Sequence, residues 1–200
     1  KLPVVITRGY VAFPEQQTTL NVQREISLNA INDSKESFES YCVVVNQKDF
    51  NVENINSYDE IYEYGCICKI LEASKTRSET RVKISGFKRI KLTDFILDSE
   101  KNCIYTNALI LETIEGDPAE EMAIVKKIVE TIEKNPVSII FNSPITDSFK
   151  GELNKGLSAE ELFNNLVNKV NSNPERKVAL LKEDDLNQRL MGLLLLMQEA

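Results

Sequence analysis

The 200-residue sequence has no histidine and no tryptophan. Without histidine the chain cannot build a catalytic triad, a cysteine–histidine pair or an imidazole metal site. Carboxylate, lysine, serine, threonine and cysteine side chains remain as reactive groups, but no spacing among them indicates a catalytic site. We therefore expect no catalytic residue, no metal ligand and no bound cofactor in this chain.

The sequence also lacks a surplus of cations. Its 24 lysine and arginine residues against 31 aspartate and glutamate residues give a net charge of −7. Nucleic acids and anionic membranes attract proteins that carry excess positive charge. We therefore expect neither a nucleic acid nor a membrane as a partner of this chain.

Long apolar runs are absent too. No run approaches the roughly 18 residues of a membrane span, and the first residues do not open a signal peptide. Because 42% of the residues are hydrophobic, the chain can bury a sizeable core, and we expect a soluble folded protein. The chain begins with Lys1 rather than methionine, so we expect it to be a piece of a longer protein.

Cysteine is scarce. The four cysteines, Cys42, Cys66, Cys68 and Cys103, are too few for a disulfide scaffold in a chain of this length. Cys66 and Cys68 alternate within a strand-like run, which places them on one face of a strand. We expect reduced thiols packed in the core, in preference to a cysteine-only metal site.

Strand-like patterns occupy the first part of the sequence. Alternating β-branched and aromatic residues predict strands at 4–6, 41–45, 64–72, 80–85, 88–97 and 103–112. One short helix is predicted at 24–33, with Ile26, Ala30 and Ile31 on one face. Because the strands follow one another with short connections, we expect a curled antiparallel sheet or a small barrel.

Helix signals dominate after residue 116. Asp117-Pro118 with Glu120, Ser158 with Glu161, Asn173-Pro174, and Asp184 or Asp185 each mark a helix start. The predicted apolar face of the first of these helices is Met122, Val125, Ile128, Val129 and Ile132. Residues 137–157 are predicted to be irregular. The chain is therefore predicted to be an α+β protein, with a β-rich subdomain at 1–115 and an α-helical bundle subdomain at 116–200.

Two motifs resemble functional sites without completing them. The segment 151–158 has the two glycines of a phosphate-binding loop, but Leu157 stands where that motif needs lysine, so we interpret it as an ordinary loop. The carboxylate clusters at 120–121, 160–161 and 183–185 lie at predicted helix starts. There they complement the helix dipole, which favours capping over acid–base chemistry or metal binding.

Positive charge is concentrated in one region. Residues 69–91 carry eight cations against Glu72 and Glu79, a net charge of +6, which leaves −13 for the rest of the chain. Two interpretations stay open: a solvated strand face, or a docking surface for an acidic partner. Within this region Gly86 is expected to allow a bend or a bulge.

A set of short motifs near the start is more specific in combination. Leu2-Pro3, Arg8-Gly9, Val11 and Phe13-Pro14 precede Val22-Gln23-Arg24-Glu25. Later come Tyr64-Gly65-Cys66-Ile67, the run 82–90 that contains Gly86 and Arg89, and the closing segments 177–181 and 185–190. In this order the motifs resemble the N-terminal domain of the Lon family of ATP-dependent proteases, over nearly the whole chain. Thr19, Gln23 and Ser85 depart from the family pattern, which puts the shape of the loop 15–23 in question.

The resemblance implies a function. It implies a non-catalytic substrate-recognition domain of an ATP-dependent AAA+ serine protease, which captures unfolded or damaged proteins and helps to organise a homo-hexamer with other Lon subunits. ATP and Mg²⁺ would be bound by other domains of the parent enzyme. The alternative is a stand-alone Lon-like domain that binds a peptide or a small ligand without protease activity. Enrichment in Asn, Ile and Lys suggests an AT-rich bacterial genome, and hence the cytoplasm.

Substrate-binding residues are predicted in the early segment. A site that captures unfolded proteins should expose apolar groups beside a polar rim. The predicted contacts are Tyr10, Phe13, Pro14, Leu20 and Val22, for each of which membership of the β core is the alternative. Four further residues are expected to have structural or docking roles: Arg8, Arg24, Gly86 and Arg89.

Overall fold

The computed structural model describes residues 1–134, 151 and 155–199. Its contacts divide the chain into two compact units, Lys1–Leu111 and Glu112–Ala200. The first unit holds a mixed β-sheet and one α-helix, and the second holds helices, so the predicted α+β class is confirmed. Most of the segment 137–157, predicted to be irregular, lies outside the described residues.

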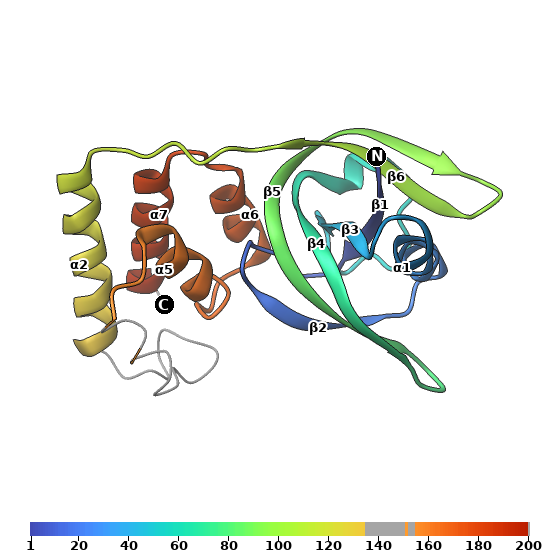
Figure 1. The fold of residues 1–200 in the computed structure, drawn as a ribbon, viewed down its shortest axis with the longest axis horizontal. Coiled ribbons are helices and arrows are strands. Elements are labelled where there is room, and N and C mark those ends of the chain that lie inside the picture. The colour runs from blue at the N-terminus through green and yellow to red at the C-terminus, as the bar shows by residue number, and fades with distance from the viewer. Residues whose placement is uncertain (135–150, 152–154, 200) are drawn as a thin grey trace. The chain divides into compact units, whose positions relative to one another are not determined.

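The sheet of the first unit closes on itself. The elements of this unit are β1 (Leu2–Thr7), β2 (Gln17–Val22), α1 (Glu25–Ser37), β3 (Tyr41–Gln47), the 3-10 helix η1 (Tyr58–Glu60), β4 (Ile61–Lys75), β5 (Thr80–Asp98) and β6 (Cys103–Ile110). The strand order is β2-β5-β4-β3-β1-β6, and β6 pairs in turn with β5. Strands β1, β3, β4, β5 and β6 therefore form a ring, which Figure 1 shows as a small barrel.

The expectation of a wholly antiparallel sheet was wrong at one pairing. β1 and β3 are parallel, with Val4 opposite Val43 and Ile6 opposite Val45. Parallel neighbours need a long crossover, and the segment between these strands, which includes β2 and α1, provides it. β2 was not predicted, because only Leu20 and Val22 of Gln17–Val22 are apolar. The strands predicted separately at 80–85 and 88–97 form one continuous strand, β5, and the other strands were predicted to within a few residues.

Two apolar clusters fill the β unit. The first gathers α1 residues such as Ala30 and Ile31 with one face of the sheet, which confirms most of the predicted helix face. The second lies on the opposite face and includes Val43, Ile61 and Ile90. All four cysteines are free and buried, as expected. Burial raises the pKa of the Cys42 thiol to about 12, so the thiol stays protonated at neutral pH.

Gly86 lies where β5 passes closely over the segment 13–16. Its N–H donates to the carbonyl oxygen of Gln16 at 2.8 Å, and its own carbonyl oxygen accepts from the N–H of Glu15 at 3.0 Å. A side-chain carbon at Gly86 would lie 2.8 Å from the carbonyl carbon of Phe13 and closer still to its oxygen. The ladder between β4 and β5 shifts register beside this glycine, which confirms the predicted bulge.

The helical unit begins its helices at the predicted caps. Its described helices are α2 (Pro118–Lys134), α5 (Ala159–Leu166), α6 (Pro174–Lys182) and α7 (Leu186–Glu199). The Ser158 Oγ accepts from the N–H of Glu161 at 3.2 Å, and the Asn173 Oδ1 accepts from the N–H of Arg176 at 2.9 Å. The predicted apolar face of α2 was wrong at Met122, which is 73% exposed. Ile124, two residues further on, is buried instead.

Arg189 of α7 is fully buried in the helical unit. Its Nη2 donates to the Thr113 Oγ1 at 2.8 Å, and the same nitrogen lies 3.8 Å from the Glu160 Oε1. Its guanidinium also lies over the Phe163 ring. These contacts join α7, α5 and the segment before α2. Among the described residues, no helix is both long enough and apolar enough to cross a membrane.

Gly86→Ala tests the close approach in the β unit. The new methyl group has to displace backbone atoms of Phe13, so we expect the free energy of unfolding to fall by about 2 kcal/mol or more. Urea denaturation followed by circular dichroism measures the change. Ser85→Ala, on the adjacent residue, adds no atom and is the control. Equal midpoints for the two variants would contradict the close approach.

Candidate functional site

The β unit holds an open groove of about 690 Å³. It lies between the start of α1, the loop before η1, the end of β5 and the start of β6. Its apolar lining is Ile6, Ile26, Ile55, Tyr58, Leu97 and Ile104, and its polar lining is Arg24, Glu25, Asn54, Asn56 and Ser57. We call this cavity the apolar groove.

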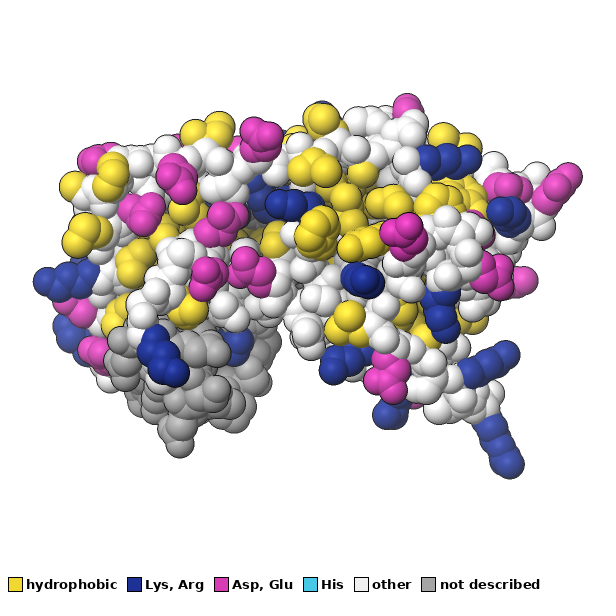
Figure 2. Space-filling model, in the orientation of Figure 1, with side chains coloured by type: hydrophobic (Ala, Val, Ile, Leu, Met, Phe, Trp, Pro, Cys, Tyr) yellow, Lys and Arg dark blue, Asp and Glu magenta, His cyan; other side chains and the backbone are white. Residues whose placement is uncertain are grey.

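Large apolar side chains of the apolar groove are open to solvent. Leu97 is 51% exposed and Tyr58 is 38% exposed. The Tyr58 ring stacks on Phe95, with ring centroids 4.9 Å apart and planes inclined by 14°. Figure 2 shows hydrophobic side chains gathered on the visible face of the β unit. Exposed apolar surface inside a concave site is typical of a binding site.

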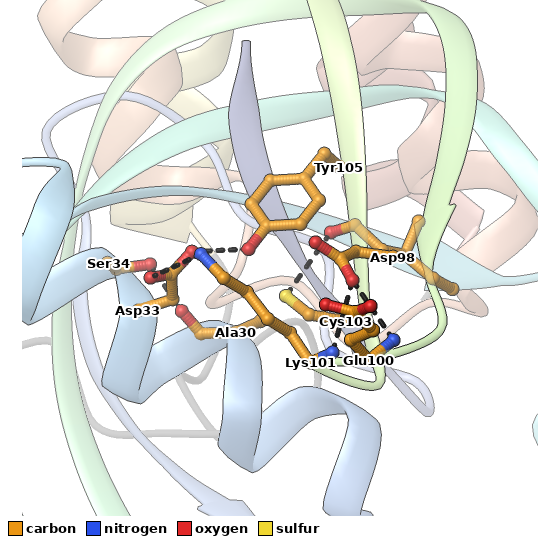
Figure 3. Close-up of polar contacts among 9 residues, drawn as sticks. Ala30, Asp33, Ser34, Asp98, Glu100, Lys101, Cys103 and Tyr105 are labelled. Atoms are coloured by element: carbon orange, nitrogen blue, oxygen red, sulfur yellow. Dashed lines mark hydrogen bonds and ion pairs between the residues drawn. The ribbon is translucent and has the colours of Figure 1, made fainter.

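One wall of the apolar groove is held by α1. Leu97 and Ile104 are direct partners in the ladder between β5 and β6, close to the turn that joins these strands. The Tyr105 hydroxyl donates to the Asp33 Oδ2, and the Lys101 ammonium lies 3.7 Å from the other oxygen of Asp33 (Figure 3). Burial and the hydrogen bond to Asp33 raise the pKa of Tyr105, so this hydroxyl keeps its proton.

The turn itself is ordered by further hydrogen bonds. The Asp98 Oδ1 accepts from the N–H groups of Glu100 and Lys101, both at 3.1 Å (Figure 3). The Asn29 side chain donates to the carbonyl oxygen of Asn102 at 3.0 Å. Since Asn29 and Asp33 are one helical turn apart, α1 holds the turn at two successive positions.

The loop that forms the other wall is held by Gln47. The Gln47 amide nitrogen donates to the carbonyl oxygens of Asp49 at 2.6 Å and Val52 at 2.7 Å. Its amide oxygen accepts from the Arg24 guanidinium. Gln47 is buried, so this one side chain links the start of α1 to the loop.

A second cavity of about 360 Å³ adjoins the apolar groove and shares Ile6 and Arg24 with it. Arg8 and Tyr10 reach this second cavity from a turn in which Gly9 has a φ of 107°, a conformation that glycine adopts readily. The turn is fixed because the Gly9 N–H donates to the Asn46 Oδ1 at 2.9 Å. Burial raises the pKa of the Tyr10 phenol.

The structure brings some of the predicted site residues together and separates others. Tyr10, Leu20, Val22, Arg8 and Arg24 all line the second cavity. Of these, Val22 is only 6% exposed.

Four predicted residues lie outside both cavities. Phe13 is fully buried, Pro14 is half-buried, Gly86 packs on Phe13, and Arg89 is buried in β5. Burial of Phe13 and Val22 favours core membership for both. Direct substrate contact by the remaining predicted residues stays a prediction.

Sequence reasoning missed the apolar groove. Residues 46–60 lie between two predicted strands and were assigned to no element or site, so Ile55 and Tyr58 were not considered as site residues. Leu97 was assigned to a strand without regard to its exposure. One signal was available: Phe95-Ile96-Leu97 is an apolar run at a strand end, and consecutive residues of a strand cannot all face one core.

The basic region contributes an exposed strand face rather than a groove. Val82 and Ile84 are buried while Arg81 and Lys83 are exposed, so the cations of this strand face solvent. The Arg81 Nε lies 3.4 Å from the Glu79 Oε1. Figure 2 shows basic side chains projecting at the tip of the hairpin between β4 and β5. The nearby glutamate supports the solvated-face interpretation for this part of the region.

Solved structures with the same fold are N-terminal domains of Lon proteases. The N-terminal domain of a Mycobacterium avium complex Lon protease superposes with a TM-score of 0.76 at 13% identity, covering 99% of this chain and 98% of that one. The Lon N-terminal domain protein from Xanthomonas campestris superposes with a TM-score of 0.63 at 15% identity. This superposition covers 97% of this chain and 96% of that one. At these identities the likeness establishes the fold.

Sequence comparison gives the family. The model of the ATP-dependent protease La (LON) substrate-binding domain matches residues 1–199, and the chain belongs to this family. It is 25% identical over 194 residues to the Lon protease of Finegoldia magna, and 32% identical over 123 residues to that of Acinetobacter baumannii. These matches cover 95% and 60% of this chain, but 24% and 15% of the two relatives. The chain thus spans about a quarter of the length of relatives such as the Finegoldia protein.

The apolar groove offers binding chemistry. Its lining provides aliphatic and aromatic surface, amide groups and a guanidinium. Among the described residues, no group of three or more cysteine and carboxylate side chains could hold a metal ion. Chemically, then, the arrangement suits the binding of an apolar segment with a polar edge.

Tyr105→Phe tests how the wall of the apolar groove is held. The substitution removes only the hydroxyl that donates to Asp33, so we expect the free energy of unfolding of the β unit to fall by about 1–2 kcal/mol. We also expect faster amide hydrogen exchange in the turn between β5 and β6. Tyr41→Phe is the matched control, since the Tyr41 hydroxyl has no hydrogen-bond partner among the described residues. Equal exchange in both variants would show that the hydrogen bond does not hold this wall.

Proposed function

We propose that this chain is a non-catalytic substrate-recognition domain that captures unfolded or damaged proteins in the apolar groove for an ATP-dependent protease. The observation that supports the proposal most strongly is the groove itself, with Leu97 and Tyr58 exposed in a family of substrate-binding domains. An unfolded protein displays apolar side chains that its folded form buries. Covering such side chains in the apolar groove removes apolar surface from water, which lowers the free energy of the complex.

The size and shape of the apolar groove fit this role. About 690 Å³ accommodates a few side chains of an extended segment. Its polar rim of asparagine and serine can bond the backbone of whichever segment binds, without selecting side chains. A site of this kind recognises many sequences weakly, as a quality-control protease requires.

We further propose that the parent protein carries the catalytic parts. It would be an AAA+ serine protease that binds ATP and Mg²⁺ outside this chain and assembles as a homo-hexamer, which this domain helps to organise. The relatives named above are bacterial Lon proteases, which supports a cytoplasmic site of action. We retain a β-rich subdomain at 1–115 and a helical subdomain at 116–200 as the functional division.

Leu97→Gln tests substrate capture. Leu97 is about half exposed, and covering this exposed half by a bound segment contributes about 1 kcal/mol to binding. The substitution should therefore raise the Kd about fivefold. Fluorescence anisotropy with reduced, carboxymethylated α-lactalbumin, which is permanently unfolded, gives the Kd. Native α-lactalbumin is the negative probe.

Leu109→Gln provides the matched control. Leu109 is 55% exposed on β6, and it does not line the apolar groove. We expect its Kd to stay close to that of the unmodified chain. Equal weakening by both substitutions, or binding that neither affects, would contradict capture in the apolar groove.

A further inference from the structure

Two arginines line the second cavity, and one of them also lines the apolar groove. Arg24 lines both cavities, and Arg8 lines the second. The two positive charges are close enough that Arg8 lowers the pKa of the Arg24 guanidinium, in addition to the larger effect of burial. We call these residues the arginine pair.

Among the residues that the structure describes, the arginine pair is hydrogen-bonded only to neutral oxygens. The Arg8 Nε donates to the carbonyl oxygen of Phe50 at 2.9 Å, and the Arg24 Nη2 donates to the Gln47 amide oxygen. Within the described part of the chain, no carboxylate oxygen lies within 4.0 Å of either guanidinium. Glu25 lines the apolar groove as well, and it too stays beyond that distance.

This arrangement is unusual in a chain with seven more acidic than basic residues. Like charges repel, and partial burial of Arg24 adds a desolvation cost. A carboxylate placed between the two guanidinium groups would relieve both effects through charge-assisted hydrogen bonds. Gln47 and Phe50 leave further N–H groups of each guanidinium available for such a ligand.

We propose that the arginine pair binds the carboxylate of an aspartate or glutamate side chain within the captured segment, next to an apolar side chain that occupies the apolar groove. This inference rests on the proposed function and narrows its substrate class to acidic-apolar segments. An internal side chain fits better than a chain terminus, because the two cavities adjoin at Arg24 and a segment can continue from one into the other.

Three peptide-binding measurements test this specificity. The parent probe is a twelve-residue peptide with blocked ends and a central Leu-Leu flanked by aspartates, and its counterpart has asparagines instead. We expect the aspartate peptide to bind the 200-residue chain about tenfold more tightly. Because the chain has a net negative charge, long-range electrostatics oppose this preference, so a local site must produce it. The asparagine peptide with a free terminal carboxylate should bind like its blocked form.

Variants of the chain locate the preference. Arg24→Gln should reduce the ratio between the two peptides to about twofold or less, and Arg24→Lys should retain part of it. Arg8→Gln, at an exposed residue, gives the same test if Arg24→Gln fails to fold. Arg77→Gln removes the same charge at the exposed hairpin tip, and it should leave the ratio unchanged.

The outcomes separate this inference from the proposed function. If both peptides bind equally and Leu97→Gln weakens both, the carboxylate specificity is wrong while capture in the apolar groove stands. A gain for the free terminal carboxylate, without one for the aspartates, would also overturn the inference. If neither peptide binds, the proposed function and this inference fail together.

Discussion

The β unit depends on one strand that pairs with three others. β5 contacts β2 and β4 along its first half and β6 along its second, so it both closes the barrel and carries a wall of the apolar groove. The pairing of β5 shifts register beside Gly86, where the backbone of Phe13 leaves no room for a side chain, and again between Leu92 and Asp94. Beyond these bulges, Phe95 and Leu97 extend into the region where β5 pairs with β6 alone. Ring closure and the exposed apolar surface therefore have the same cause.

Two small polar networks turn this surface into a site. The hydrogen bond between Tyr105 and Asp33 fixes the end of β5 and the start of β6 on α1. Gln47 fixes the opposite loop and Arg24. The free energy that these hydrogen bonds contribute keeps the apolar groove open instead of letting Leu97 and Tyr58 collapse on each other. Recognition by a pre-formed groove costs less conformational entropy than folding around each substrate. This suits the proposed capture of many different unfolded segments.

Local signals in the sequence predicted the elements well and the site poorly. Ser158 and Asn173 predicted the starts of their helices, because a cap is a contact between residues three positions apart. The parallel pairing of β1 with β3 could not be predicted in this way, since it depends on where α1 returns the chain. The N-terminal motifs led to Tyr10, Leu20, Arg8 and Arg24, which do meet at one cavity. Ile55 and Leu97 were not predicted as site residues, because their exposure arises from the tertiary arrangement of a loop and a strand end. The apolar run Phe95-Ile96-Leu97 is the one local signal that points to it.

Methyl NMR of the isoleucine and leucine side chains, during titration with reduced, carboxymethylated α-lactalbumin, tests capture in the apolar groove most directly. Ile26, Ile55, Leu97 and Ile104 line the groove, whereas Leu71 and Leu109 are exposed outside it. We predict that the methyl signals of the first four residues shift or broaden, and that those of the other two stay in place. Shifts confined to Leu71, Leu109 or the leucines of α7, with the groove signals unchanged, would contradict substrate capture by this groove.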